Sequence, residues 1–297
     1  MPPSALQIAA SLDRLRRAPR PLCGREREMA AVRAHVRARR PLFVSGPAGV
    51  GKSALLHAVY ADCAAGEEGA PVFYCGESAS RRRLTTHMLV NQFLTRGRLQ
   101  SSYIERREAI RSLSGLRRFV SREPLADLTR MMQQNLPHGR ICLLLDHLHQ
   151  PARSVASLIE VWLETTPLIL VARHPEDLGP ARWLLSGFDH LEIAPLDTPT
   201  LVRIARQVTA RLGGEHLREA ELHAAAARAR GCPRRLVQIL RAAVQPEYRK
   251  RGTIQWKLVD IDLRIRLLRS NNPRSPHPCG REERHDRNVN CHRATVD

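Results

Sequence analysis

A glycine-rich octapeptide directly after an apolar run limits the possible folds of this chain more than any other feature. The run Pro41–Ser45 leads without a break into Gly46-Pro47-Ala48-Gly49-Val50-Gly51-Lys52-Ser53. This octapeptide, which we call the phosphate loop, matches G-x-x-x-x-G-K-[ST], whose glycines allow successive backbone N–H groups to turn inward around phosphates. A helix that begins near Lys52 would direct its positive N-terminus at the same anion. We therefore expect the loop to bind ATP, with Lys52 at the β- and γ-phosphates and the Ser53 hydroxyl on Mg²⁺.

Short apolar runs predict a parallel β-sheet. They occupy residues 41–45, 71–75, 141–145, 168–172 and 190–194. Runs that are apolar on both faces and separated by helices indicate a parallel sheet covered on both sides. Between the second and third runs, the apolar residues of segment 77–139 recur at helical spacing, as expected for helices packed on a core. The predicted fold class is α/β, a doubly wound parallel sheet with the core of a P-loop NTPase.

A helical block after the last strand predicts a small lid. Thr198 precedes Pro199 and is expected to cap the first helix of this block. A second helix is centred on residues 215–230, and a third starts at Pro233.

Four segments follow from these assignments: an N-terminal extension (1–20), an ATPase core (21–196), a helical lid (197–245) and a basic C-terminal extension (246–297). Within the last segment, residues 259–267 fit both the alternation of a strand and one face of a helix. The residues beyond Ser270 are polar and are expected to be disordered.

The third apolar run ends in a carboxylate, Asp146. This pattern is typical of a Walker B strand, which carries an Asp to the sheet edge beside the phosphate loop, where it holds the water shell of Mg²⁺. Many hydrolysing relatives place a Glu directly after this Asp to orient the attacking water. Here the next residue is His147, and no carboxylate follows within four residues. His147 and Glu77, at the end of the second run, are the two candidates for water activation, so the sequence predicts nucleotide binding and leaves hydrolysis open.

Three further elements stand in order around these motifs: Gly24-Arg25-Glu26 before the first strand, Arg173 after the fourth, and Gly231-Cys232-Pro233-Arg234 in the lid. With the phosphate loop and Asp146, this order resembles the AAA+ and STAND branch of P-loop ATPases, near the origin-recognition-type ATPases and the signalling NTPases with a Gly-x-Pro motif. The resemblance spans residues 20–245. It implies that the stretch around Arg25 lies against the adenine and that Arg173 senses the γ-phosphate. It further implies that Pro233 touches the nucleotide and that Arg234, or Arg235 beside it, acts as a second sensor.

The formal net charge of +19 bears on possible partners. Segments 41–80 and 131–200, which hold the nucleotide motifs, carry −3 and −4, whereas segment 81–130 between them carries +8. Basic surfaces beside a less basic nucleotide site suit contact with nucleic acid. Only three residues are Lys, so the charge is almost all Arg, a bias that genome composition also produces.

Seven scattered cysteines without a Cys-x-x-Cys pair argue for a reducing compartment, and no apolar run reaches membrane-spanning length. We therefore expect a cytoplasmic protein with no membrane contact. A set of possible zinc ligands in the tail matches no standard zinc module. Its members are Cys279, His285, Cys291 and His292.

Three functions remain open at this stage. The first is a regulatory ATPase that couples its nucleotide state to a macromolecular partner, a protein or a nucleic acid. One form of this function is a homo-oligomer in which a neighbour's arginine completes the site. The second is a switch that binds ATP without hydrolysing it. The third is a DNA-binding protein that uses ATP only structurally.

Overall fold

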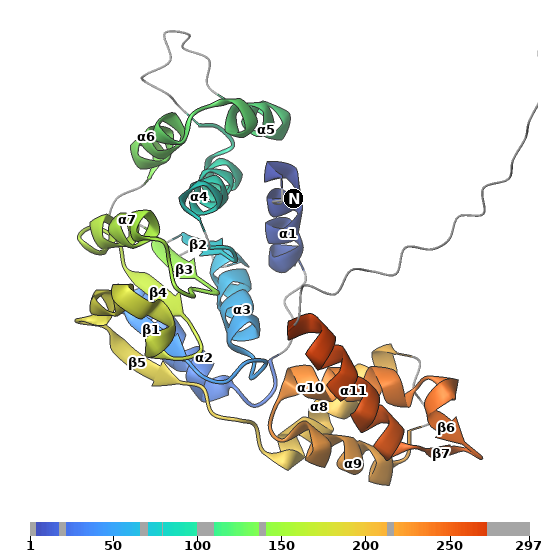
Figure 1. Cartoon of the computed structure of the whole chain (residues 1–297). Helices are drawn as coiled ribbons and strands as arrows, with labels where there is room; N and C mark the ends of the chain where they lie inside the picture. Colours follow the sequence, from blue (N-terminus) through green and yellow to red (C-terminus); the bar gives the residue numbers. More distant parts are fainter. Residues whose placement is uncertain are drawn as a thin grey trace, which may run out of the picture.

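The computed structural model describes residues 4–17, 22–65, 71–78, 80–99, 110–136, 141–212 and 217–271. Its centre is a five-stranded parallel sheet in the order β2-β3-β4-β1-β5 (Figure 1). The strands are β1 (Leu42–Ser45), β2 (Val72–Cys75), β3 (Cys142–Leu145), β4 (Leu168–Val171) and β5 (Asp189–Glu192). Strands β1 to β4 are buried along their whole length, as their unbroken apolar runs require. Strand β5 lies at the edge and is partly exposed. The predicted α/β class and parallel sheet are confirmed.

Helices cover both faces of this sheet (Figure 1). Helices α2 (Glu26–Ala38) and α3 (Lys52–Ala65) pack together on one side. Helix α7 (Arg153–Leu163) and the 3-10 segment η1 (Pro175–Leu185) pack together on the other. This arrangement leaves the carboxyl ends of the strands free to carry the loops that form the site.

The segment between β2 and β3 is helical, as predicted. It forms α4 (Arg81–Arg96), α5 (Leu113–Arg122) and α6 (Leu125–Asn135). Ser80 caps α4 by accepting a hydrogen bond from the Arg83 backbone N–H, and Gly97 ends the helix in the left-handed region that glycine tolerates. Of the apolar positions that recur at helical spacing in this segment, Leu125 is only partly buried. The others are buried: Leu84, Met88, Val90, Leu128, Met131 and Met132.

Helix α1 (Ala5–Arg17) packs against α3, α4 and α5. Its buried residues Ile8 and Leu12 belong to the same hydrophobic cluster as the sheet. The helix lies in the segment that the sequence assigns to an N-terminal extension, and it forms one wall of a pocket described below.

The lid consists of α8 (Thr198–Arg211), α9 (Glu219–Ala229) and α10 (Pro233–Ala243), packed around a hydrophobic cluster of their own. The expected cap of α8 is wrong by one residue. Asp197, not Thr198, is the cap, because its carboxylate accepts a hydrogen bond of 2.9 Å from the Thr200 backbone N–H. Thr198 and Pro199 then form the first turn of the helix.

After the lid, a 3-10 turn η2 (Pro246–Tyr248) and a small antiparallel hairpin of β6 (Arg249–Lys250) and β7 (Thr253–Ile254) precede α11 (Trp256–Asn271). Residues 259–267 are therefore helical, and buried Val259 faces the lid cluster. The described residues end at Asn271, so the prediction of disorder beyond Ser270 concerns residues that lie almost entirely outside them. All four possible zinc ligands also lie outside the described residues. Of the helices that the structure describes, none combines the length and apolar character needed to cross a membrane.

Candidate nucleotide site

The phosphate loop joins β1 to α3 at the carboxyl edge of the sheet. Gly46, Gly49 and Gly51 have positive φ angles of 143°, 81° and 111°, a region that side-chain-bearing residues rarely adopt. A side chain at Gly46 would approach the Ile193 carbonyl oxygen to 2.6 Å, so this glycine is also needed for close packing. At Gly51 no atom lies within 4 Å of the position that a Cβ would take, which leaves the loop open on that side.

Lys52 is the first residue of α3, and its ammonium group folds back over the loop. It donates hydrogen bonds to the carbonyl oxygens of Gly46 and of Pro47, the latter at 3.0 Å. Burial lowers the pKa of Lys52, Asp146 opposes this shift, and Arg173 adds to it. Because a phosphate would supply the opposite charge that this half-buried ammonium lacks, the environment of Lys52 fits an anion-binding role.

Asp146 directly follows β3 and is only 1% exposed. Its Oδ2 accepts a hydrogen bond of 3.1 Å from the Tyr74 hydroxyl, and its Oδ1 accepts one of 2.8 Å from the His147 backbone N–H. The Tyr74 hydroxyl also lies 2.9 Å from Nε2 of His57 on α3. Burial and the neighbouring Asp146 carboxylate raise the pKa of Tyr74, so its hydroxyl stays protonated and donates. This network holds the carboxylate in one orientation beside the phosphate loop.

His147 follows with a φ of 54°, in the left-handed region. This backbone turn brings its Nε2 to 3.4 Å from the Ser53 hydroxyl and 3.6 Å from Oδ2 of Asp146. The imidazole thus lies beside both groups that the sequence assigns to Mg²⁺. A hydroxyl and a carboxylate are the hard oxygen donors that Mg²⁺ prefers, so Ser53 and Asp146 fit this ion. No cluster of three or more His, Cys, Asp or Glu side chains suited to another metal occurs in the described ranges.

The other candidates for catalysis lie in different places. The Arg173 backbone carbonyl accepts a hydrogen bond of 2.9 Å from the Gly46 N–H, and the charge of Arg173 acts on Lys52. Glu77 lies 3.3 Å from Arg83 and lines a separate pocket. Among its contacts within the described parts of the chain, none is with the phosphate loop. The structure therefore joins Arg173 to the phosphate loop through its backbone carbonyl, whereas the described contacts of Glu77 are with Arg83 and Cys75.

Arg25 occupies a buried position between the core and the lid, with an exposure of 4%. Its guanidinium donates to the carbonyl oxygens of Val50, at 3.2 Å, and Ala194, at 2.6 Å, and forms an ion pair with Glu28. The same side chain therefore ties α2 to the phosphate loop and to the segment that leads into the lid.

The N-terminus of α10 touches the phosphate loop directly. The Arg234 N–H donates to the Gly49 carbonyl oxygen at 3.3 Å, and the Cys232 thiol lies 3.7 Å from the Ala48 carbonyl oxygen. Pro233, the first residue of α10, lies between them in the chain. Two helix N-termini, those of α3 and α10, thus meet at one loop, and both favour an anion there.

Gly231, just before this contact, adopts a φ of 76°, and its carbonyl oxygen accepts a hydrogen bond from the Leu196 N–H. A Cβ at this position would lie 2.4 Å from Cβ of Pro195, so the close approach of lid and core requires glycine.

Two contributors to the site were not predicted from the sequence: Tyr74 and Ser78. Tyr74 was read as part of an apolar strand, and its bond to Asp146 depends on the pairing of β2 with β3. The Ser78 hydroxyl lies 3.2 Å from the Asp146 carbonyl oxygen and 3.3 Å from that of His147, which fixes the turn between them. No local pattern in the sequence marks either residue, because both act across strands.

The parallel sheet, phosphate loop and Walker B carboxylate together define a nucleotide-binding protein of the P-loop class. A family model described as "AAA ATPase domain" matches residues 21–173, more than half of the chain. The chain belongs to this family, and it is a nucleotide-dependent ATPase of the AAA+ type.

Solved structures show the same fold. The Walker-type ATPase paby2304 of Pyrococcus abyssi aligns with a TM-score of 0.55 and 15% identity, over 85% of this chain and 77% of that one. The ORC1 protein of Aeropyrum pernix, solved in complex with DNA, aligns with a TM-score of 0.52 and 16% identity, over 84% and 67%. At such low identity the likeness establishes the fold alone. No curated protein matches the chain in sequence.

Proposed function

We propose that the chain binds ATP with Mg²⁺ between the phosphate loop and the lid, and that the nucleotide state sets the lid position for a macromolecular partner. The contact between Gly49 and Arg234, at 3.3 Å, carries this proposal. Because the loop and the lid already touch, a phosphate held by the loop would meet the N-terminus of α10. A change in the nucleotide would then change what the lid can contact.

Different residues contact the phosphates, the Mg²⁺ ion and the adenine in this proposal. The backbone N–H groups of the phosphate loop and Lys52 hold the phosphates, and Ser53 and Asp146 hold Mg²⁺, which neutralises phosphate charge when bound. The segment around Arg25 borders the adenine, and Arg173 and Arg234 respond to the γ-phosphate. Pro233 fixes the start of α10 at this contact.

The partner is a protein or a nucleic acid, and the basic charge of the chain supports the latter. A homo-oligomer would allow an arginine of one copy to complete the site of the next. A DNA-binding protein that needs ATP only for its structure is an alternative that the same surface charge permits. The expected compartment is the cytoplasm.

A slow or non-hydrolysing switch is the second candidate, and the position of His147 favours it. The residue after Asp146 offers an imidazole where many hydrolysing relatives have a carboxylate, and Glu77 is paired with Arg83 elsewhere. If the protein does hydrolyse ATP, Glu77 and His147 are the proposed water-activating residues.

An assay of ATP turnover with and without duplex DNA, combined with mass measurement of the assembly, tests these functions. The proposal expects the assembly mass or the DNA affinity to differ between ATP, ADP and no nucleotide. Identical behaviour in all three states would contradict the coupling. Loss of ATP turnover in Glu77→Gln but not in His147→Ala would identify Glu77 as the general base. If no partner induces turnover, the non-hydrolysing switch is the function that remains.

A further inference from the structure

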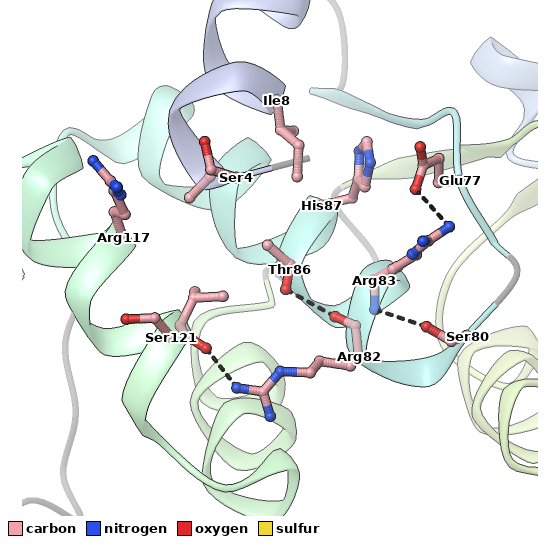
Figure 2. A pocket seen from close by; sticks show the side chains of 12 residues that line it. Ser4, Ile8, Glu77, Ser80, Arg82, Arg83, Thr86, His87, Arg117 and Ser121 are labelled. Atoms are coloured by element: carbon pink, nitrogen blue, oxygen red, sulfur yellow. Dashed lines mark hydrogen bonds and ion pairs between the residues drawn. The ribbon is translucent and has the colours of Figure 1, made fainter. Parts of the chain in front are cut away.

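A pocket of about 350 Å³ lies apart from the phosphate loop, among α1, α4, α5 and the end of β2 (Figure 2). Of the residues that line it, only Glu77 is also a candidate residue for ATP hydrolysis, and its carboxylate pairs with Arg83. Its volume falls at the lower end of the range of about 300–1,000 Å³ that small-molecule sites occupy. The lining residues that matter here are Ile8, Glu77, Arg83, His87, Arg117 and Val120.

His87 is the unusual member of this lining. It is 8% exposed, and both of its ring nitrogens are buried without a hydrogen-bond partner. Burial lowers the pKa of His87 to about 4, so the ring is neutral near pH 7 and offers one donor and one acceptor. A buried polar group without a partner destabilises the fold, and a ligand with a polar group would supply the missing hydrogen bond.

The charge of the lining favours an anion. The lining holds three guanidinium groups, those of Arg82, Arg83 and Arg117, and a single carboxylate, that of Glu77. Arg83 pairs with Glu77, and Arg82 donates to the carbonyl oxygens of Val120 and Glu123. Within the parts that the structure describes, Arg117 has no ion-pair or hydrogen-bond partner, so its guanidinium is available.

Apolar groups complete the pocket. Ala5 and Ile8 of α1 and Val120 of α5 form walls against which the body of a ligand would pack. Figure 2 shows Ile8 of α1 and His87 of α4 near each other, and Arg117 of α5 on the opposite side of the view. A site with apolar walls and a few convergent polar groups is the usual form of a small-molecule site.

We propose that this pocket binds a small organic anion with an apolar body, whose charged group meets Arg117 and whose other polar group meets His87. The site goes beyond the proposed nucleotide function and does not depend on it.

A short path of contacts connects this pocket to the nucleotide site. Glu77 lines the pocket, and the next residue, Ser78, bonds the carbonyl oxygens of Asp146 and His147. Tyr74, three residues earlier on β2, bonds the Asp146 carboxylate. An anion in the pocket would also attract Arg83, which lines the pocket and pairs with Glu77. We expect the displaced Glu77 to shift the adjoining turn and so to change the ATP affinity.

The test uses 8-anilinonaphthalene-1-sulfonate, an aromatic anion whose fluorescence rises in apolar sites, as the probe on the full chain. The wild type is expected to bind one molecule at this site. Arg117→Ala should weaken binding about tenfold through loss of one charge-assisted contact. Arg118→Ala, the matched change one residue later and outside the pocket, should leave the affinity as it is.

A second variant distinguishes loss of probe binding at the pocket from general misfolding of the protein. Ser121→Trp places a large ring in the pocket from an exposed position on α5, so it should abolish probe binding while circular dichroism and ATP binding stay normal. If both variants bind the probe as the wild type does, the pocket holds only water and the proposal is wrong.

Coupling is measured separately by titrating ATP with and without saturating probe. The ATP affinity of the wild type should change, and that of Ser121→Trp should not. Equal ATP affinity of the wild type in both conditions would overturn the coupling.

Discussion

At the scale of single residues, His147 stands where a carboxylate would orient the attacking water. Its Nε2 is 3.4 Å from Ser53 and 3.6 Å from Asp146, so the position itself reaches the site. What the position lacks is the carboxylate that many hydrolysing relatives place there to orient the attacking water. Because the residue at this position reaches the site but is not a carboxylate, ATP binding by this chain does not by itself imply ATP hydrolysis.

Replacing His147 by Glu should therefore raise ATP turnover by about tenfold or more, because a positioned general base contributes roughly 10²–10⁴ to such a rate. The measurement is steady-state phosphate release at saturating ATP. His149→Glu, which makes the same charge change two residues later, serves as the control and should leave turnover at the wild-type level. A His147→Glu variant no faster than the wild type would show that something other than the missing carboxylate limits the rate.

His87 makes a residue-scale prediction about stability. Its folded-state pKa of about 4 lies below its ordinary value of 6.5 because of burial. Between these two values the unfolded chain binds more protons than the folded chain. The free energy of unfolding should therefore fall as the pH decreases through this window, by up to about 1.4 kcal/mol per pH unit from this residue.

Urea unfolding of the wild type and His87→Gln from pH 4 to 8 isolates this contribution, since the amide does not titrate. The difference in free energy of unfolding between the two proteins should be constant above pH 7 and change below 6.5. A difference that stays constant down to pH 4 would contradict the buried, neutral state of the ring.

At the scale of elements, a single side chain connects helix α2, the phosphate loop and the approach to the lid. Arg25→Ala removes hydrogen bonds to the carbonyl oxygens of Val50 and Ala194 and leaves both acceptors unpaired. The expected loss of stability is about 2–3 kcal/mol, measured by denaturant unfolding. Arg27→Ala, an exposed arginine on the same helix, should cost less than about 0.5 kcal/mol. Equal effects of the two changes would show that Arg25 is not a structural connector.

Some elements could be predicted from local sequence and others could not. Residues 41–45 and 141–145 form short apolar runs that are typical of buried parallel strands, and each leads into a recognisable motif, so the sheet and these loops were predictable. Residues 259–267 satisfy two periodicities at once, and only packing of α11 on the lid decides for a helix. Asp197 and Thr198 are both good caps, so the sequence alone does not select one.

The site residues also divide into those that local sequence predicts and those that it does not. The phosphate loop and Asp146 were predictable because one continuous motif specifies each of them. The bond from Tyr74 to Asp146 was not, because it follows from the order of strands in the sheet. Glu77 shows the limit of placing a residue by its strand alone. It lies at the end of β2 as expected, yet its carboxylate pairs with Arg83.

At the scale of the whole molecule, the charge of +19 on 297 residues sets the expected behaviour toward nucleic acid. If phosphate contacts by arginines provide the affinity, the affinity for duplex DNA should fall steeply as salt rises from about 50 to 200 mM. Fluorescence anisotropy with a labelled duplex at several salt concentrations measures this slope. An affinity that hardly changes with salt would exclude the phosphate-contact form of the DNA function.

The central claim is that one nucleotide is held by the phosphate loop and the lid together. Titration calorimetry with ATP and Mg²⁺ tests it most directly on the wild type, Lys52→Ala, Arg234→Ala and Arg241→Ala, the last an exposed arginine at the far end of α10. The account predicts one site per chain, near-complete loss of affinity in Lys52→Ala, weaker binding in Arg234→Ala and wild-type binding in Arg241→Ala. Unchanged ATP affinity in both Lys52→Ala and Arg234→Ala would contradict it.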